Sequence, residues 1–115
     1  MEPTGAKIAG SDNRIVGRAL RFIEKSYHLK KLNIQMIADE LSVSSCWLST
    51  LFKRETGQTL NGYITMLRIE KAKEIIAQGD YKVYEVADMV GYGSARYFSK
   101  VFSKVTAQIP SNYRE

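Results

Sequence analysis

The chain repeats one pattern of residues about 50 positions apart, and this repeat limits the fold more than any other feature. Residues 37–63 read IADELSVSSCWLSTLFKRETGQTLNGY, and residues 86–113 read VADMVGYGSARYFSKVFSKVTAQIPSNY. Ala38-Asp39 corresponds to Ala87-Asp88. Five later positions also correspond, after one residue is inserted in the second copy: Ser49, Phe52, Thr56, Gln58 and Tyr63 match Ser99, Phe102, Thr106, Gln108 and Tyr113. The insertion lies between the two expected helices, where a surface turn tolerates it. One structural unit is therefore built twice.

Each copy has the pattern of a helix, a short turn and a second helix. The first helix holds a small residue, Ala38 or Ala87, which permits close helix approach. The second helix has an apolar inner face, formed by Leu48, Leu51 and Phe52 in one copy and by Phe98, Val101 and Phe102 in the other. The pattern predicts a helix-turn-helix, whose second helix can enter a DNA major groove. Helical hairpins that serve only for packing share the pattern, so both interpretations stay open here.

Apolar residues follow helical spacing along the whole chain, and no stretch alternates with period two. The two prolines, Pro3 and Pro110, lie near the ends. We therefore expect an all-α fold of about seven helices. The expected helices are one carrying the stripe Ile15, Val16, Ala19, Leu20 and Ile23, one after the N-cap Asn33, and others near residues 44–57, 59–78, 82–90 and 94–105, with a short one at Pro110.

The expected organisation is two motif units joined by a linker helix. Residues 1–12 are interpreted as a flexible lead-in, residues 13–58 as the first helix-turn-helix unit, residues 59–79 as the linker helix and residues 80–115 as the second unit. A helix over residues 59–78 spans about 30 Å at 1.5 Å per residue. One turn of B-DNA is about 34 Å long. The linker length therefore favours one monomer that reaches two successive major grooves.

The charge distribution strengthens the DNA interpretation. The chain has 17 Lys and Arg against 12 Asp and Glu, a net charge of +5. Neither residues 41–54 nor residues 89–114 contain any acid, whereas a merely solvated face usually mixes both signs. The second helix of each motif therefore presents cations without local anions, as a phosphate-lined groove requires. These cations are Lys53, Arg54, Arg96, Lys100 and Lys104.

The sequence contains no set of residues that indicates an enzyme, a cofactor or a metal site. The only histidine, His28, and the only cysteine, Cys46, are too few for a structural zinc site. The single cysteine excludes an intrachain disulfide and fits a reducing cytoplasm, and no apolar run reaches the roughly 20 residues of a membrane span. Trp47 and Tyr97 occupy matching repeat positions, and we expect both mainly at the rim of the core.

These residues together resemble the DNA-binding domain of AraC/XylS-type transcription regulators. The resemblance rests on IADELSVSSCWLSTLFKRETGQTLNGYI, RIEKAKEII and VADMVGYGSARYFSKVFSKVTAQIPSNYR, and it covers about residue 13 to the C-terminus. The linker helix and the second motif are most similar to the C-terminal domains of YesN-like response regulators. The resemblance implies two helix-turn-helix units held apart by the linker helix. It also implies a bacterial transcription regulator, expected to be an activator, with double-stranded DNA, RNA polymerase and an N-terminal sensing or receiver domain as partners.

The resemblance also implies which side chains meet the DNA. The implied base contacts are Ser45, Cys46, Ser49 and Thr50 in the first unit and Ala95, Arg96, Ser99 and Lys100 in the second. Phosphate contacts are expected from Ser44, Lys53, Arg54, Ser94 and Lys104. The first unit offers only short polar side chains, which predicts weak base discrimination there. The family usually has glycine where Ala107 stands, so the end of the sixth helix is expected to differ.

Two other classes of function are weighed against this one. A helical protein-interaction module without sequence-specific DNA binding would have the same helices. An RNA-binding domain is disfavoured because the sequence has no RRM or KH signature.

Overall fold

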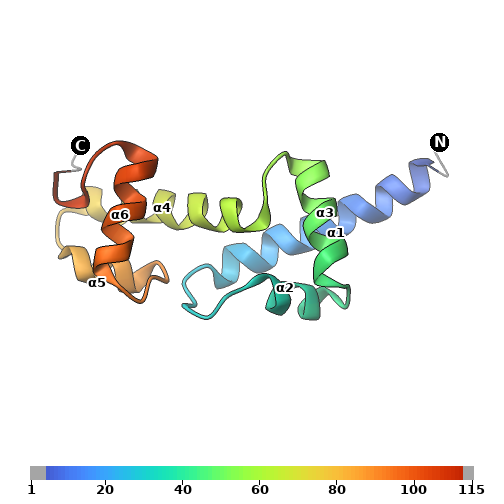
Figure 1. The fold of residues 1–115 in the computed structure, drawn as a ribbon, viewed down its shortest axis with the longest axis horizontal. Helices are drawn as coiled ribbons and strands as arrows, with labels where there is room; N and C mark the ends of the chain where they lie inside the picture. Colours follow the sequence, from blue (N-terminus) through green and yellow to red (C-terminus); the bar gives the residue numbers. More distant parts are fainter. Residues whose placement is uncertain (1–4, 113–115) are drawn as a thin grey trace. The chain divides into compact units, whose positions relative to one another are not determined.

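The computed structural model describes the backbone of residues 5–112 and the side chains of residues 13–111. Six α-helices follow one another and precede a 3₁₀ turn (Figure 1). They are α1 (Gly5–Ser26), α2 (Ile34–Leu41), α3 (Ser45–Thr56), α4 (Leu60–Gln78), α5 (Val83–Met89), α6 (Ala95–Thr106) and η1 (Pro110–Asn112). The described residues form no strand. The expected all-α class is confirmed.

Helix α1 begins earlier than the sequence pattern suggested. It starts at Gly5, within the residues interpreted as a flexible lead-in, and residues 1–4 lie outside the described part of the chain. No proline lies between Pro3 and Pro110, so nothing in residues 5–12 prevents the helix from extending toward the N-terminus. No helix within residues 5–112 is both long and apolar enough to cross a membrane.

The chain forms two compact units. The N-terminal unit contains the chain through residue 26 together with residues 32–63, and the C-terminal unit contains residues 27–31 and the chain from residue 64 onward. Helix α4 begins in the first unit and continues in the second. It starts at Leu60 rather than at Thr59, because Thr59 caps it: the Thr59 hydroxyl accepts a 2.9 Å hydrogen bond from the Gly62 N–H.

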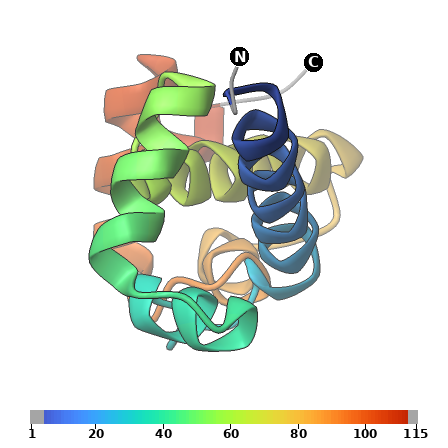
Figure 2. The same cartoon turned by 90° about the vertical axis from the view of Figure 1, so that its right-hand side faces the viewer.

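In the N-terminal unit, helices α1, α2 and α3 pack against one another around a shared core (Figure 2). The side chains buried there are Val16, Ala19, Ile23, Ile37, Ala38, Leu41, Leu48, Leu51, Phe52 and Leu60. Helix α2 begins at the predicted N-cap, since the Asn33 side chain accepts a 2.8 Å hydrogen bond from the Met36 N–H. This core fixes which face of α3 points outward.

The core of the C-terminal unit is formed by α4, α5 and α6. Its buried side chains are Ile69, Ala72, Ile76, Val86, Ala87, Val90, Tyr92, Phe98 and Phe102. Three of its aromatic rings form a chain, with Phe98 lying 5.5 Å from Tyr92 and 5.7 Å from Phe102 between ring centroids. These contacts join α6 to the turn between α5 and α6. Because Phe98 and Phe102 lie in the core, the opposite face of α6 is exposed.

Residues 27–31, between α1 and α2, form a strap that belongs to the C-terminal unit. The Arg68 guanidinium donates hydrogen bonds to the carbonyl oxygens of Tyr27 (2.8 Å) and Leu29 (2.9 Å). Lys30 pairs with Asp88. At Gly91, a Cβ would lie 2.5 Å from the Tyr27 carbonyl oxygen, so only glycine fits under the strap.

Candidate nucleic-acid interface

Helices α3 and α6 are built alike from their first residue to their last. The Ser44 hydroxyl caps α3 by accepting a 3.0 Å hydrogen bond from the Trp47 N–H, and the Ser94 hydroxyl caps α6 through the Tyr97 N–H at 3.1 Å. At the other end, the Thr56 and Thr106 hydroxyls each donate a 2.8 Å hydrogen bond to the backbone carbonyl four residues earlier. The repeat in the sequence is therefore a repeat of local geometry.

Both helices also end in the left-handed conformation. Gly57 ends α3 with φ of 79°, and Ala107 ends α6 with φ of 65°. The expectation that alanine changes the end of the sixth helix is wrong. The backbone keeps the same turn, and Ala107 adopts a conformation that is unfavourable for a residue with a Cβ.

The eight predicted base-contact residues share one pattern of exposure in the two helices. Cys46 and Thr50 of α3 are exposed, and so are their equivalents Arg96 and Lys100 of α6. The residues beside them are half-buried in both motifs, namely Ser45, Ser49, Ala95 and Ser99. The opposite face of each helix lies in the core. Equivalent positions are therefore exposed in both motifs, where α3 has short side chains and α6 has long cationic ones.

Three amide side chains that the sequence pattern did not indicate as site residues lie beside this face in the N-terminal unit. Asn33, Gln35 and Asn61 line a shallow hollow together with Ile34, Ser45, Cys46 and Ser49. Asn33 lies before α2 and Asn61 lies in α4, so packing of separate segments brings them next to α3. Their amides are hydrogen-bonding groups near three of the predicted base contacts.

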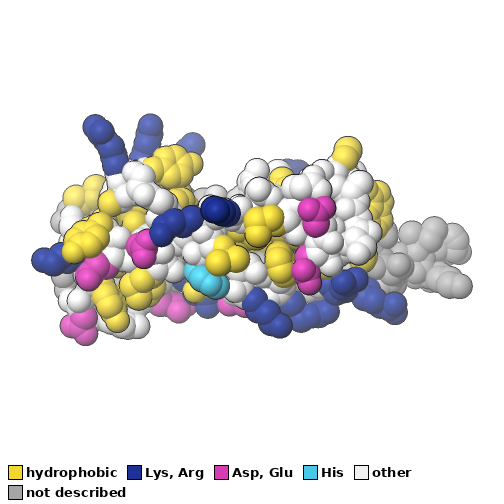
Figure 3. All heavy atoms as spheres, turned by 90° about the horizontal axis from the view of Figure 1, so that it is seen from below, with side chains coloured by type: hydrophobic (Ala, Val, Ile, Leu, Met, Phe, Trp, Pro, Cys, Tyr) yellow, Lys and Arg dark blue, Asp and Glu magenta, His cyan; other side chains and the backbone are white. Residues whose placement is uncertain are grey.

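The expected phosphate contacts lie at the C-terminal ends of the two helices. Lys53 and Arg54 are exposed in the last turn of α3, and Lys104 is exposed in the last turn of α6. Arg54 also bonds to the Glu55 carboxylate at 3.1 Å. Among the residues whose side chains are described, Lys53 and Lys104 have no ion pair. Lysine and arginine side chains project together from one edge of the C-terminal unit (Figure 3).

Trp47 and Tyr97 are expected at the rim of the core, and both are more exposed than their buried neighbours, while the Tyr97 ring packs against the buried Tyr92 ring. Trp47 is 44% exposed and Tyr97 is 58% exposed. Each is the third residue of its helix, next to an exposed predicted base contact, Cys46 or Arg96. The residue type alone favoured burial, but the helix phase turns both side chains outward.

Burial shifts the pKa of two groups behind α6. Desolvation lowers the pKa of Arg68 from its usual value, and it raises the pKa of the Tyr92 hydroxyl. The Arg68 guanidinium lies 5.2 Å from the centre of the Tyr92 ring, a cation–π distance. Both residues lie in or against the core of the C-terminal unit, so their role is structural.

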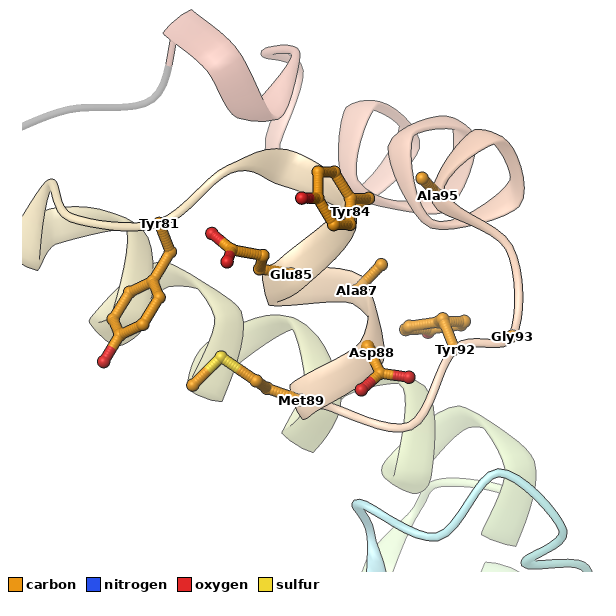
Figure 4. Close-up of a pocket in the computed structure, with 9 residues that line it drawn as sticks. All are labelled: Tyr81, Tyr84, Glu85, Ala87, Asp88, Met89, Tyr92, Gly93 and Ala95. Atoms are coloured by element: carbon orange, nitrogen blue, oxygen red, sulfur yellow. The ribbon is translucent and has the colours of Figure 1, made fainter.

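A second hollow lies on α5 of the C-terminal unit, between the helix and its flanking loops (Figure 4). Its lining includes two carboxylates, both already engaged. Glu85 accepts a 2.7 Å hydrogen bond from the Lys82 N–H, and Asp88 pairs with Lys30. Among the described residues, no group of three His, Cys, Asp or Glu side chains could hold a metal ion.

Two matching helix-turn-helix motifs, whose second helices carry exposed cations and a single acid, Glu55 beside Arg54, define a DNA-binding domain of transcription regulators. A family model described as a helix-turn-helix domain matches residues 37–115. The chain belongs to this family, the AraC-type helix-turn-helix domains.

Individual relatives agree with this assignment. The chain is 34% identical over 103 residues to the transcriptional regulatory protein YesN of Bacillus subtilis. The matched region covers 87% of this chain and 28% of YesN. It is also 34% identical over 103 residues to an HTH-type transcriptional regulator of Pseudoalteromonas carrageenovora, covering 90% of this chain and 60% of that protein. This chain therefore spans only part of these relatives.

Solved structures show the same fold. The C-terminal domain of AraT, a response regulator from Geobacillus stearothermophilus, matches with a TM-score of 0.84 and 34% identity, covering 86% of this chain and 82% of that one. The C-terminal domain of the response regulator yesN from Fusobacterium nucleatum matches with a TM-score of 0.82 and 33% identity, covering 84% of this chain and 94% of that one.

Proposed function

We propose that this chain binds double-stranded DNA sequence-specifically and activates transcription, with α3 and α6 as its recognition helices. The observation that carries the proposal is the matched outward face of the two helices. Two equivalent positions in each helix are exposed and the two beside them are half-buried, and no acid lies among residues 41–54 or 89–114. A groove lined by phosphates attracts a cationic face more strongly than one of mixed charge.

The two recognition helices have unequal roles in this proposal. Arg96 and Lys100 are long, exposed cations that suit the O6 and N7 acceptors of guanine. The α3 face offers Ser45, Cys46, Ser49 and Thr50, which are short and reach base edges less far. The second unit therefore supplies most of the sequence discrimination. Lys53, Arg54 and Lys104, with the capping residues Ser44 and Ser94, hold phosphates and set the position of the helices.

One monomer uses both helices in this proposal. Helix α4 runs without interruption from the N-terminal unit into the C-terminal unit, and its 19 residues extend about 28 Å at 1.5 Å per residue. This length approaches one turn of B-DNA, so α3 and α6 enter successive major grooves. Because the two faces differ, the site is asymmetric rather than palindromic.

The proposed partner domain follows from the longer relatives, whereas RNA polymerase follows only from the proposed role as an activator. YesN extends well beyond the part that this chain matches. AraT and the Fusobacterium yesN are response regulators whose C-terminal domains match. We accordingly propose a receiver or sensing domain and RNA polymerase as protein partners.

Binding-site selection from random duplexes tests this function. We expect enrichment of one asymmetric sequence, with the sharper base preference in the half bound by the second unit. Arg96→Ala should cost about 1–3 kcal/mol on the selected site and relax the preference at one base pair. Recovery of no preferred sequence would instead favour a helical protein-interaction module.

A further inference from the structure

Trp47 and Tyr97 are large aromatic residues at equivalent, exposed positions of the two recognition helices. Trp47 is 44% exposed and Tyr97 is 58% exposed, although the apolar part of each ring favours burial. Two independent copies of the motif thus place an aromatic side chain on the surface at the same position. The Tyr97 ring contacts the buried Tyr92 ring, yet both aromatic residues keep a large exposed surface.

Each aromatic residue shares a flank of its helix with a cation. Arg54 follows Trp47 by seven residues in α3, and Lys104 follows Tyr97 by seven residues in α6. Seven residues are two turns, so the two members of each pair point within about 20° of one another. These flanks adjoin the outward faces, since Cys46 and Arg96 directly precede the aromatic residues. On this flank, each recognition helix therefore carries an aromatic ring near its N-terminus and a cation near its C-terminus.

At both positions, the polar group of the aromatic ring is the hydrogen-bond donor that a ligand could use. The backbone N–H of Trp47 donates to the Ser44 hydroxyl and that of Tyr97 to the Ser94 hydroxyl, so neither N–H points to a ligand. The indole N–H and the phenol O–H remain as side-chain donors. The Tyr97 ring also packs 5.9 Å from the buried Tyr92 ring, which limits its orientation.

We propose that Trp47 and Tyr97 contact the sugar-phosphate backbone beside each groove, an inference that rests on the proposed function. The indole N–H and the phenol O–H donate to phosphate oxygens, and the rings pack on deoxyribose. Bases in a duplex are stacked on one another and leave no face for these rings. Both residues are thus positioning residues, which set how deeply each helix enters its groove without reading sequence.

Fluorescence tests Trp47 directly, because it is the only tryptophan of the chain. The full chain is titrated with a 40-base-pair duplex of random sequence, and binding is followed separately by the anisotropy of a dye on the duplex. We expect the Trp47 emission to change and its quenching by acrylamide to fall at least about twofold on binding, because the duplex covers the ring. Binding without any change in emission or acrylamide quenching overturns the proposal, whereas no binding to any duplex overturns the proposed function.

The variant Tyr97→Phe tests the hydrogen bond in the second motif, because it keeps the ring and removes only the donor. Affinity should fall by about tenfold for preferred and scrambled duplexes alike, the loss of one hydrogen bond to a charged group. The slope of log K against log salt should stay unchanged, since tyrosine carries no charge. Lys104→Gln should instead lower that slope by about 0.9.

Tyr84→Phe is the matched control, because Tyr84 is 62% exposed but lies on α5. We expect it to bind as the wild type does. Circular dichroism establishes that each variant is folded. Wild-type affinity in Tyr97→Phe, or a loss confined to one sequence, overturns the backbone contact.

Discussion

Arg68 in α4 donates a 2.8 Å hydrogen bond from its Nε to the backbone carbonyl of Tyr27, which lies 41 residues earlier in the chain. The same carbonyl approaches Gly91, where an added Cβ would come within 2.5 Å of it. Arg68 and Gly91 therefore both contact the backbone carbonyl of Tyr27 in the strap. This contact joins the segment between α1 and α2 to the turn that precedes α6.

Replacing either Arg68 or Gly91, the two residues that contact the strap, should destabilise the C-terminal unit. Arg68→Met loses two hydrogen bonds from a charged group and leaves two carbonyls without their donor, at a cost of about 2–3 kcal/mol. Gly91→Ala forces a Cβ toward the Tyr27 carbonyl at φ of 101° and should cost at least about 2 kcal/mol. Urea unfolding followed by circular dichroism measures both.

The two losses should not add, because both variants release the same strap. We expect the double variant to be more stable than the sum predicts by about 0.5 kcal/mol or more. Lys31→Met, an exposed change in the strap, is the control and should have little effect. Strict additivity would show that Arg68 and Gly91 act on separate parts of the unit.

The ends of the recognition helices predict opposite effects of two reciprocal substitutions. Ala107→Gly relieves a left-handed conformation that carries a Cβ and should stabilise the protein by about 0.5–1 kcal/mol. Gly57→Ala introduces that strain into open space and should destabilise it by about 1 kcal/mol. Thermal unfolding of both variants checks the signs. Equal signs would mean that the backbone at residues 57 and 107 is not alike in solution.

Neutralising the proposed phosphate contacts should weaken binding to every duplex by a similar factor. Lys53→Gln, Arg54→Gln and Lys104→Gln should each lower the slope of log K against log salt by about 0.9. Lys82→Gln is the control, because Lys82 is exposed just before α5 rather than on a recognition helix. If the salt slopes of all three variants equal that of the control, these residues do not contact phosphates.

The two-groove proposal predicts a change in footprint length. Reversing the charge of Arg96 and Lys100 to glutamate should abolish insertion of α6 by repulsion from phosphates. Hydroxyl-radical footprinting should then show protection of only the half bound by α3, at protein concentrations that restore binding. The matched control, Lys31→Glu with Lys82→Glu, changes the same charge elsewhere and should keep the full footprint. A half-length footprint for the wild type would instead show that one motif binds alone.

Local sequence determined the helices, their caps and the register of the two motifs. Asn33, Ser44 and Ser94 cap the helices that follow them, because their side-chain oxygens lie within reach of backbone N–H groups three residues ahead. Gly57 ends α3 for an equally local reason, its freedom to take a positive φ. Helical spacing of apolar residues then fixes the inner and outer faces, which is why the same predicted base-contact positions are exposed in both motifs.

Tertiary structure decided everything that depends on neighbours distant in sequence. No local pattern assigns residues 27–31 to the C-terminal unit, because that assignment rests on Arg68 and Gly91. Asn61 meets the α3 face only because α4 packs beside it. The extent to which Trp47 and Tyr97 are exposed likewise depends on packing: residue type favours burying an aromatic ring, but the core has space only for side chains that face it. Helix formation is a short-range property of the chain, whereas burial and contact depend on how the helices pack.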